Sequence, residues 1–322
     1  MSKVTLKDIA KETGFSVSKV SRAISGTGAI KEEDQKIILQ TAQRLGYKTS
    51  VVSSKSDSEN LLDRIAVLIP KFNAYLTSDF IQRLNDRLLK NGYVVDYYTV
   101  EGSTRPEAEL LQFIINKGYK AIIYKPRRVR KDVQAVINTT STPIFSYGQV
   151  YGNCININYD NSRMMYEMTN IAIGAGAKKI LYVGTFKDDI EVGSKRFDGF
   201  MRAVEEAKLT YHYLECECNI NKAYEMARDI EFKQYDAVVT AMDKLSLGIF
   251  RYLMESKIIP GKDILLSGVE NYDVTNIITP SMTTVELSKA SVVDIIIERL
   301  TNNDFRPQNL SVPYKIIRRE SM

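Results

Sequence analysis

The 322-residue sequence predicts an α/β protein with an N-terminal three-helix helix-turn-helix head and a two-lobed body of parallel sheets and flanking helices. In residues 1–49, apolar residues recur at helical spacing, with turn residues between the periodic segments. From Arg64 onward, short apolar runs alternate with amphipathic segments, which is typical of parallel strands joined by covering helices. These patterns divide the chain into a head at 1–49, a linker at 50–61 and a body at 62–322.

The composition is that of an ordinary globular protein, with 44% hydrophobic and 26% charged residues. No apolar run reaches the roughly 18–20 residues that cross a bilayer, and the N-terminus lacks the pattern of a signal peptide. We therefore expect a cytoplasmic protein that does not contact membranes. Three cysteines and one histidine, His212, lack the spacing of a disulfide framework or a zinc site, so we expect neither a metal nor a cofactor.

Positive charge is concentrated in the head. Residues 1–49 hold nine Lys or Arg against five Asp or Glu, whereas the whole chain has a formal net charge of +5. The remaining 273 residues are therefore nearly neutral in sum. A small basic unit attracts the phosphate backbone of nucleic acid, so we expect double-stranded DNA as a partner of the head.

The first head helix is expected to begin after Thr5 and to end at Gly14. The Thr5 hydroxyl can bond an amide of the first turn, and Asp8 completes a pair that resembles a capping box. Glycine at the other end is a common helix terminator. One face of this helix is apolar, with Leu6, Ile9 and Ala10.

Two more head helices follow, the second capped by Ser16 and the third at about 31–45. Residues expected to face inward are Val17, Val20, Ala23 and Ile24 in the second helix and Ile37, Ile38, Thr41, Ala42 and Leu45 in the third. The second helix turns small polar and basic side chains outward, namely Ser18, Lys19, Ser21, Arg22 and Ser25. Periodicity alone leaves open a generic three-helix bundle with a solvated polar face.

Four short motifs in fixed order resemble the head of the lactose-repressor (LacI/GalR) family of bacterial transcription regulators. They are Val4-Thr5-Leu6-Lys7-Asp8-Ile9-Ala10, Gly14-Phe15-Ser16, Val20-Ser21-Arg22 and Leu45-Gly46-Tyr47. The resemblance implies that Val17, Ser18 and Arg22 face base edges, because arginine can bond guanine through two atoms and valine can contact the thymine methyl. It also implies phosphate contacts by Thr5, Ser16 and Ser21, and Lys19 completes the predicted DNA-binding set.

The linker departs from that family. Relatives usually continue after the position of Tyr47 with a short hinge helix whose leucine wedges into the minor groove, but Ser56 stands at the leucine position here. Five serines between residues 50 and 58 indicate a flexible linker. A serine cannot fill an opened base step as an apolar wedge does, so we expect no wedge, or Val51 or Val52 in its place.

The body contains two series of alternating elements, separated near Tyr159-Asp160-Asn161. Expected strands lie at 65–69, 94–100, 121–124, 144–145, 180–183, 211–216, 237–240 and 264–267, with helices at 78–91, 106–117, 131–138, 161–175, 194–207, 222–230 and 244–256. A strand at 283–285 and a helix at 289–301 are expected to cross back. We therefore predict an N-lobe at about 62–159 plus 286–303 and a C-lobe at about 160–285 plus the C-terminal segment.

The body also resembles the LacI/GalR family, and broadly its trehalose-type repressors. That resemblance implies a periplasmic-binding-protein-like clamp with an effector crevice at the carboxyl ends of the strands. Three residues match effector-binding motifs: Arg196 in Gly193–Phe200, Asp243 in Ala241–Gly248 and Glu270 in Ser267–Asn271. A guanidinium and carboxylates together can fix a polyhydroxylated ligand, although each residue could instead form an ordinary surface salt bridge.

Two further clusters follow expected strands. Lys71 and Phe72 follow the strand at 65–69, and Lys125-Pro126-Arg127-Arg128 follows the strand at 121–124. Cations there could bind a phosphorylated sugar or form a solvated basic rim. Phe72 could stack on a sugar ring or pack in the core.

Rival functions are an α/β enzyme, a transport-type sugar receptor and a sugar sensor with weakened operator binding. Gly174-Ala175-Gly176-Ala177 follows a helix and precedes a strand, the reverse of the order that phosphate-binding loops need. The expected function is instead that of a homodimeric DNA-binding transcription regulator, a repressor controlled by a sugar or sugar phosphate. Its two-fold symmetry would match a pseudo-palindromic operator.

Overall fold

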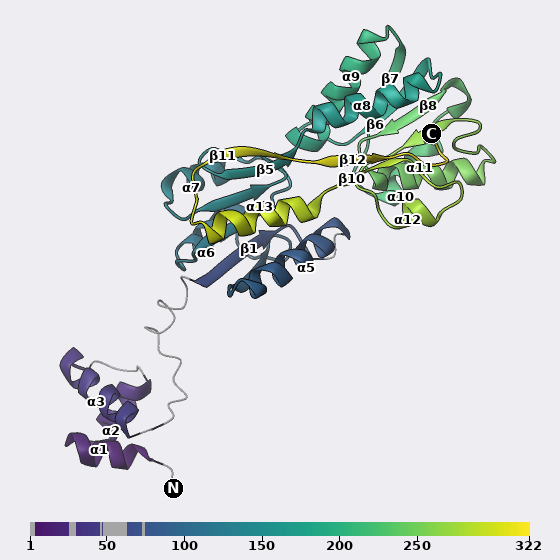
Figure 1. Ribbon diagram of the computed structural model, residues 1–322. Helices are drawn as coiled ribbons and strands as arrows, with labels where there is room; N and C mark the ends of the chain where they lie inside the picture. The colour runs from purple at the N-terminus through teal and green to yellow at the C-terminus, as the bar shows by residue number, and fades with distance from the viewer. Residues whose placement is uncertain (1–3, 26–29, 46, 48–62, 73–74) are drawn as a thin grey trace. The chain divides into compact units, whose positions relative to one another are not determined.

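The computed structural model describes residues 4–25, 30–45, 47, 63–72 and 75–322 (Figure 1). The linker predicted at 50–61, with Ser56 and the residues that could replace its wedge, lies outside the described residues. The chain divides into two compact units just before Asp63. None of the described helices is both long and apolar enough to cross a lipid bilayer.

The head consists of three helices, α1 (Leu6–Thr13), α2 (Val17–Ser25) and α3 (Glu32–Arg44). Their buried faces form one apolar core of Ile9, Ala10, Val20, Ala23, Ile24, Ile38 and Ala42. The predicted inward faces of α2 and α3 were too wide, because the side chains of Val17 and Ile37 are 42% and 47% exposed. Three short helices enclose only a narrow stripe of each other's surface.

The helix ends follow the predicted caps. The Thr5 amide and hydroxyl both donate to the Asp8 carboxylate, at 2.8 and 2.7 Å. Gly14 ends α1 with a φ of 72°, a left-handed conformation that glycine adopts without strain, and its amide donates to the Ala10 carbonyl. The Lys19 amide donates to the Ser16 hydroxyl at 3.3 Å, which caps α2.

The first lobe of the body is a six-stranded sheet with the order β11-β5-β4-β3-β1-β2, and every neighbouring pair is parallel. Its strands are β1 (Arg64–Ile69), β2 (Val94–Thr99), β3 (Ala121–Tyr124), β4 (Ile144–Tyr147), β5 (Ile155–Tyr159) and β11 (Gln308–Val312). Its helices are α5 (Tyr75–Lys90), α6 (Glu107–Ile115), α7 (Lys131–Thr139) and α13 (Lys289–Thr301). The central strands are buried along their whole length, as expected for a parallel sheet covered on both faces.

The second lobe is a four-stranded parallel sheet with the order β7-β6-β8-β9. Its strands are β6 (Lys179–Gly184), β7 (Thr210–Glu215), β8 (Ala237–Thr240) and β9 (Leu265–Ser267). Its helices are α8 (Asn161–Gly174), α9 (Lys195–Glu206), α10 (Ile220–Ala227), α11 (Asp243–Glu255) and the short α12 (Val274–Ile277). A π-helical turn at Ile190–Ser194 leads into α9.

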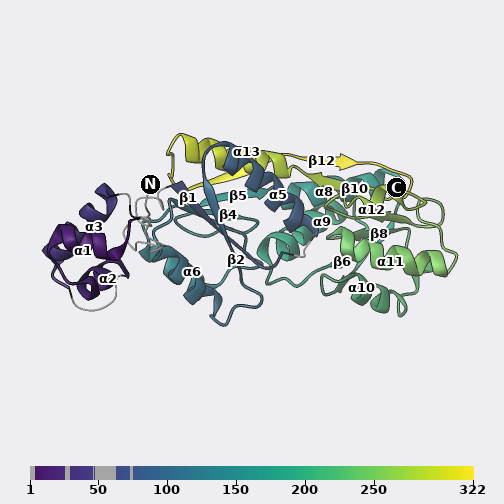
Figure 2. The same cartoon turned by 90° about the horizontal axis from the view of Figure 1, so that it is seen from below.

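The chain passes between the lobes three times, after β5, after β10 (Thr284–Leu287) and between β11 and β12 (Tyr314–Ile317). The strands β10 and β12 pair antiparallel and lie between the two larger sheets (Figure 1). After the second passage α13 packs beside α5 in the first lobe, which Figure 2 also shows. The sequence patterns did not predict β5, β11 or β12.

Asp243, predicted to bind the effector, lies at the start of α11 and is not among the residues that line the cavity described below. Its carboxylate is fully buried and accepts hydrogen bonds from the Thr284 hydroxyl at 2.6 Å and the Tyr272 amide at 2.9 Å. A Cβ atom at Gly268 would lie 2.2 Å from its Oδ1 atom, so glycine is required beside it. The carboxylate thus ties α11 to β10 and to the loop after β9.

Burial raises the pKa of Asp243 from the ordinary value of 3.8 to about 7. Between these two values the folded protein holds a proton that the unfolded chain has released. The free energy of unfolding therefore falls as pH rises through this window. We expect Asp243→Asn, which has no proton to release, to lose this part of the pH dependence.

The measurement is thermal unfolding from about pH 4 to pH 8, followed by tyrosine fluorescence. Of nineteen tyrosines only Tyr47 precedes the body, so the signal reports the body. The control is Asp263→Asn, at an exposed carboxylate that accepts from the Ile259 amide. An equal pH slope in wild type and Asp243→Asn would contradict the assignment.

Candidate functional site

The seven residues predicted to bind DNA all lie outside the buried core of the head. They are Thr5, Ser16, Val17, Ser18, Lys19, Ser21 and Arg22. Five of them, Val17 to Lys19 with Ser21 and Arg22, belong to α2 itself. An exposed valine among hydroxyl and basic side chains provides both apolar and polar contacts for base edges and phosphates.

Several of these side chains already make contacts inside the head, among them those of Ser16 and Arg22. The Thr5 hydroxyl donates to Asp8, and the Lys19 ammonium pairs with Asp34 of α3 at 2.8 Å. Lys19 also lies 4.1 Å from the centre of the Phe15 ring. A phosphate contact by Thr5 or Lys19 would require exchange of its internal bond.

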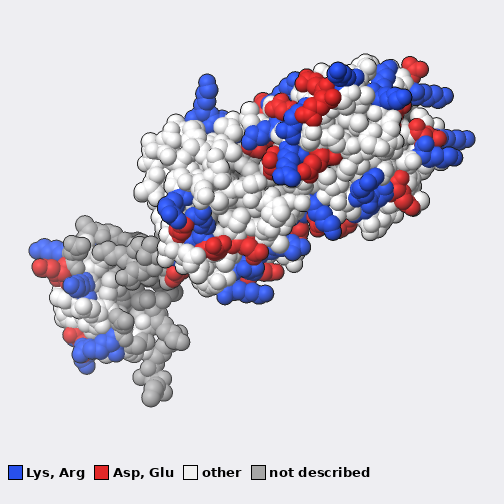
Figure 3. Space-filling model, turned by 45° about the horizontal axis from the view of Figure 1, so that its top comes forward, with Lys and Arg blue, Asp and Glu red and all other residues white. Residues whose placement is uncertain are grey.

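The body contains a cavity of about 940 Å³ between its two lobes. Its lining residues follow the carboxyl ends of β1, β3, β4 and β5 in one sheet and of β6, β7, β8 and β9 in the other. Ligands of open α/β sheets bind at this end of the strands. The face of the body in Figure 3 carries mixed positive and negative residues, so no field of a single sign marks this face.

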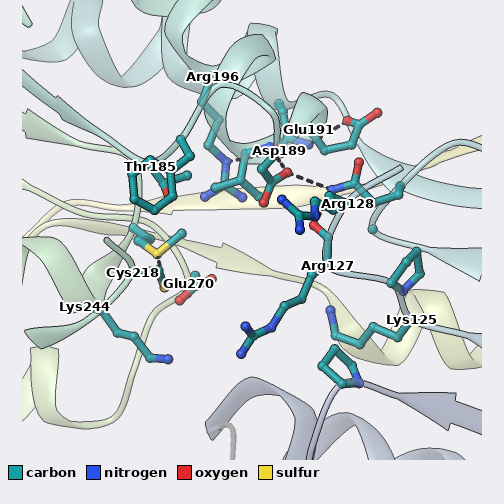
Figure 4. A pocket seen from close by; sticks show the side chains of 18 of the residues that line it. Lys125, Arg127, Arg128, Thr185, Asp189, Glu191, Arg196, Cys218, Lys244 and Glu270 are labelled. Atoms are coloured by element: carbon teal, nitrogen blue, oxygen red, sulfur yellow. Dashed lines mark hydrogen bonds between the residues drawn. The ribbon is translucent and has the colours of Figure 1, made fainter. Parts of the chain in front are cut away.

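Arg196 is the central cation of the cavity. Its side chain is 2% exposed, and it donates through Nε to Asn161 Oδ1 at 2.8 Å and through Nη1 to the Ala241 carbonyl at 2.5 Å. The Asn161 amide donates in turn to the buried carboxylate of Glu191, which also accepts from Lys195. These bonds orient the guanidinium toward the cavity (Figure 4).

Glu270 is the acidic counterpart of Arg196. Its backbone has a φ of 117°, which costs about 1–3 kcal/mol for a residue other than glycine. Burial raises the pKa of its carboxyl, and the charge of Arg196 and a hydrogen bond with Tyr272 act in the opposite direction. A strained backbone that holds a carboxylate in a cavity is typical of a binding site.

Asp189 and Gln149 connect the two lobes at the cavity. The Gln149 amide, from the loop after β4, donates to Asp189 Oδ1 at 2.7 Å, and the Val192 amide donates to the same oxygen at 3.0 Å. Burial raises the pKa of Asp189. Within the described residues, Gln149 Oε1 and Asn158 Oδ1 are buried in the cavity wall without a hydrogen-bond partner. Each can accept a hydrogen bond from a bound hydroxyl.

Several cations line the same cavity. Lys71 and Arg127 both pair with Glu101, and Arg128 pairs across the cavity with Asp188 at 2.7 Å. Lys125 and Lys244 also line it. The cations that follow β1 and β3 thus lie at the cavity, a position that fits both a site for a phosphorylated sugar and a solvated basic rim.

The structure therefore places three of the five predicted effector residues at the cavity, namely Lys71, Arg196 and Glu270. Phe72 is not among the lining residues: its side chain is 51% exposed and meets Tyr97 edge-on, at 6.1 Å between ring centres. Asp243 is also absent from the lining, because its buried carboxylate accepts hydrogen bonds from Thr284 and Tyr272.

Sequence reasoning missed Gln149, Asn158 and Asp189. Gln149 and Asn158 lie at or just beyond the carboxyl end of a strand, so applying the strand-end rule to polar residues after every strand would have found these two. Asp189 lies further along, at the start of the turn Ile190–Ser194. The cysteines add no site: Cys216 and Cys218 follow β7 and are free, and among the described residues no cluster of His, Cys, Asp and Glu is arranged to hold a metal ion.

Comparison with known proteins identifies both parts of the chain. Residues 5–50 match the family model for bacterial regulatory proteins of the lacI family, and residues 170–322 match a periplasmic binding protein-like domain. The transcriptional regulator RegA of Clostridium saccharobutylicum is 23% identical, with 98% of each chain aligned.

Solved structures give the same fold. The lac repressor dimer bound to operator and the anti-inducer ONPF superposes with a TM-score of 0.73 at 16% identity over 99% of each chain. The complex of the transcriptional regulator CelR with cellobiose gives a TM-score of 0.71 at 18% identity, over 99% of this chain and 100% of the other. These relatives regulate transcription and are not enzymes. A lacI-type head, a periplasmic-binding-protein-like body and relatives aligned over the whole length together show that this chain belongs to the LacI family of bacterial regulatory proteins.

Proposed function

We propose that this chain is a sequence-specific DNA-binding repressor whose operator binding is controlled by a sugar or sugar phosphate in the inter-lobe cavity. The observation that carries the proposal is that a head with an exposed polar and basic helix is joined to a body whose two parallel sheets end at one cavity. A bound molecule at that position touches both lobes.

The head has the chemistry to read base pairs. Arg22 is exposed on α2, and its planar guanidinium suits the two acceptors of guanine in the major groove. Val17 supplies methyl groups for thymine, and Ser18 supplies a hydroxyl. Thr5, Ser16, Lys19 and Ser21 would hold phosphates around this contact.

The cavity has the chemistry to hold a polyhydroxylated effector. Arg196 provides fixed donors, while Glu270, Asp189 and the free oxygens of Gln149 and Asn158 provide acceptors for hydroxyl protons. Cellobiose in the CelR complex supports a sugar as the class of effector. Lys71 would complete the set from the first lobe.

The lac repressor binds its operator as a dimer, which supports a homodimer here, with each head reading one half of a pseudo-palindromic operator. Effector binding controls DNA binding only if the effector prefers one arrangement of the lobes.

A second candidate, a sugar sensor with weak operator binding, is favoured by Ser56 at the wedge position. Gel shifts at two salt concentrations decide, because a steep salt slope without sequence preference would favour the sensor.

We expect Arg22→Ala to reduce the preference for operator over random duplex by about 1–3 kcal/mol, because one bidentate base contact is lost. The control is Arg44→Ala, which removes an equal charge from an exposed arginine of α3 that pairs with Glu12. Both variants lose some affinity for all DNA, but only Arg22→Ala should lose discrimination in gel shifts. Equal discrimination in the two variants would remove Arg22 from the base-reading set.

We expect Arg196→Ala to abolish thermal stabilisation by the effector, because the cavity loses its central donor. A thermal-shift screen of sugars, sugar phosphates and nucleobases identifies the effector through the melting temperature that it raises. Arg202→Ala, at an exposed arginine of the same helix, is the control. Operator preference should survive in both, and full effector response in Arg196→Ala would refute its role.

A further inference from the structure

We infer that the effector carries an anionic group, a phosphate ester or a carboxylate, which binds between Lys125 of the first lobe and Lys244 of the second. This inference rests on the proposed function and specifies its ligand class. It also assigns binding roles to two lysines that the sequence motifs left without one.

Some of the charged side chains around the cavity have a partner of opposite charge, and others do not. Six lining residues are Lys or Arg and five are Asp or Glu. Three of the six cations pair with a carboxylate: Lys71 and Arg127 share Glu101, and Arg128 pairs with Asp188. Within the described residues, the ammonium groups of Lys125 and Lys244 have no carboxylate oxygen within 4.0 Å.

Lys125 is the more enclosed of the two. Its ammonium lies 4.6 Å from the centre of the Tyr147 ring, next to Gly148. Burial lowers its pKa, while the charges of Glu270 and Asp189 raise it and that of Lys289 lowers it. An ammonium that is partly removed from water costs free energy unless an anion meets it, so this position favours a ligand that brings one.

Lys244 approaches the same space from the other lobe. It belongs to the first turn of α11, and its charge acts on Glu270, as does that of Lys125. Lys244 and Arg127 both act electrostatically on Cys218 in the cavity wall. Figure 4 shows the head groups of Lys125, Arg127 and Lys244 all pointing into the cavity.

These positions give an anion an effect on the lobes. Lys125 and Lys244 come from different lobes, so an anionic group that contacts both ammonium groups joins the lobes. Such a group binds an arrangement with the two lysines close together better than one with them apart. That difference in affinity is what shifts a conformational equilibrium.

The rest of the cavity suits hydroxyl groups better than further negative charge. Glu270 and Asp189 would repel further negative charge, whereas they and Gln149 accept bonds from hydroxyl groups. The matching molecule has hydroxyls at one part and an anionic group at another. A phosphorylated sugar and a sugar acid share this chemistry.

The test is thermal unfolding of the full chain with four probes at equal ionic strength and pH: inorganic phosphate, glucose 6-phosphate, glucuronate and glucose. We expect inorganic phosphate, and at least one of the two anionic sugars, to raise the melting temperature of the wild type more than glucose does. The anionic sugar with the larger shift distinguishes a phosphate from a carboxylate. Equal shifts for all probes, including no shift, or a larger shift with glucose, would overturn the inference.

The variants are Lys125→Gln, Lys244→Gln and the double substitution, with Lys262→Gln as the control at an exposed lysine outside the cavity lining. The double variant should lose more than half of the shift that the anions give, while Lys262→Gln keeps it. This comparison subtracts the general stabilising effect of phosphate salts, which acts on every variant alike. Equal losses in the control and double variant would also overturn the inference. A response to glucose alone would leave the proposed sugar effector intact.

Discussion

The burial of the Arg196 guanidinium is the interaction on which the rest of the site depends. A cation that is 2% exposed is tolerated only when its donors and its charge are met. Asn161, at the start of α8, and the carbonyl of Ala241, after β8, supply the acceptors. Both positions follow strands, so the guanidinium fixes the first passage between the lobes relative to the sheet of the second lobe.

The cost of that burial explains the neighbouring acids. The charge of Glu270 acts on Arg196, and Glu270 adopts a strained backbone with a positive φ. Glu191 accepts a hydrogen bond from Asn161, whose oxygen accepts one from Arg196 Nε. A ligand that lies between Arg196 and Glu270 must replace part of their mutual attraction with bonds of its own. Hydroxyl groups can do so, because each donates one hydrogen bond and accepts others.

The sequence predicted most of the framework. The strands at 121–124 and 237–240 have the predicted bounds, and the caps at Thr5, Gly14 and Ser16 form as expected. Local chemistry determines these features. The strands β5 and β12 were missed although their isoleucine and tyrosine residues favour strands, and β5 even alternates apolar and polar residues. Only β11, Gln308–Val312, has a weak local preference, and it pairs with β5, which is distant in the chain.

Local sequence signals and distant contacts also explain which site residues were predicted and which were not. The motifs correctly predicted that Arg196 and Glu270 line the cavity. Asp243 is buried instead, because Thr284 and Tyr272, which are remote in sequence, donate hydrogen bonds to its carboxylate oxygens. The exposed Phe72 shows that a residue just after a strand can turn away from the crevice. Tertiary contacts of this kind leave no local signal.

The ion pair inside the head is compatible with DNA binding on energetic grounds. Lys19 and Asp34 are both partly exposed, and such pairs contribute only about 0.2–1 kcal/mol. A phosphate can take the place of Asp34 at a similar energy while releasing counterions, which adds to the gain. The pair therefore holds Lys19 beside Phe15 before DNA arrives without removing it from the binding surface. By contrast, Arg196 in the cavity of the body is buried, so solvent screens its charge less, and the charge of a bound molecule counts for more beside Arg196 than at the head.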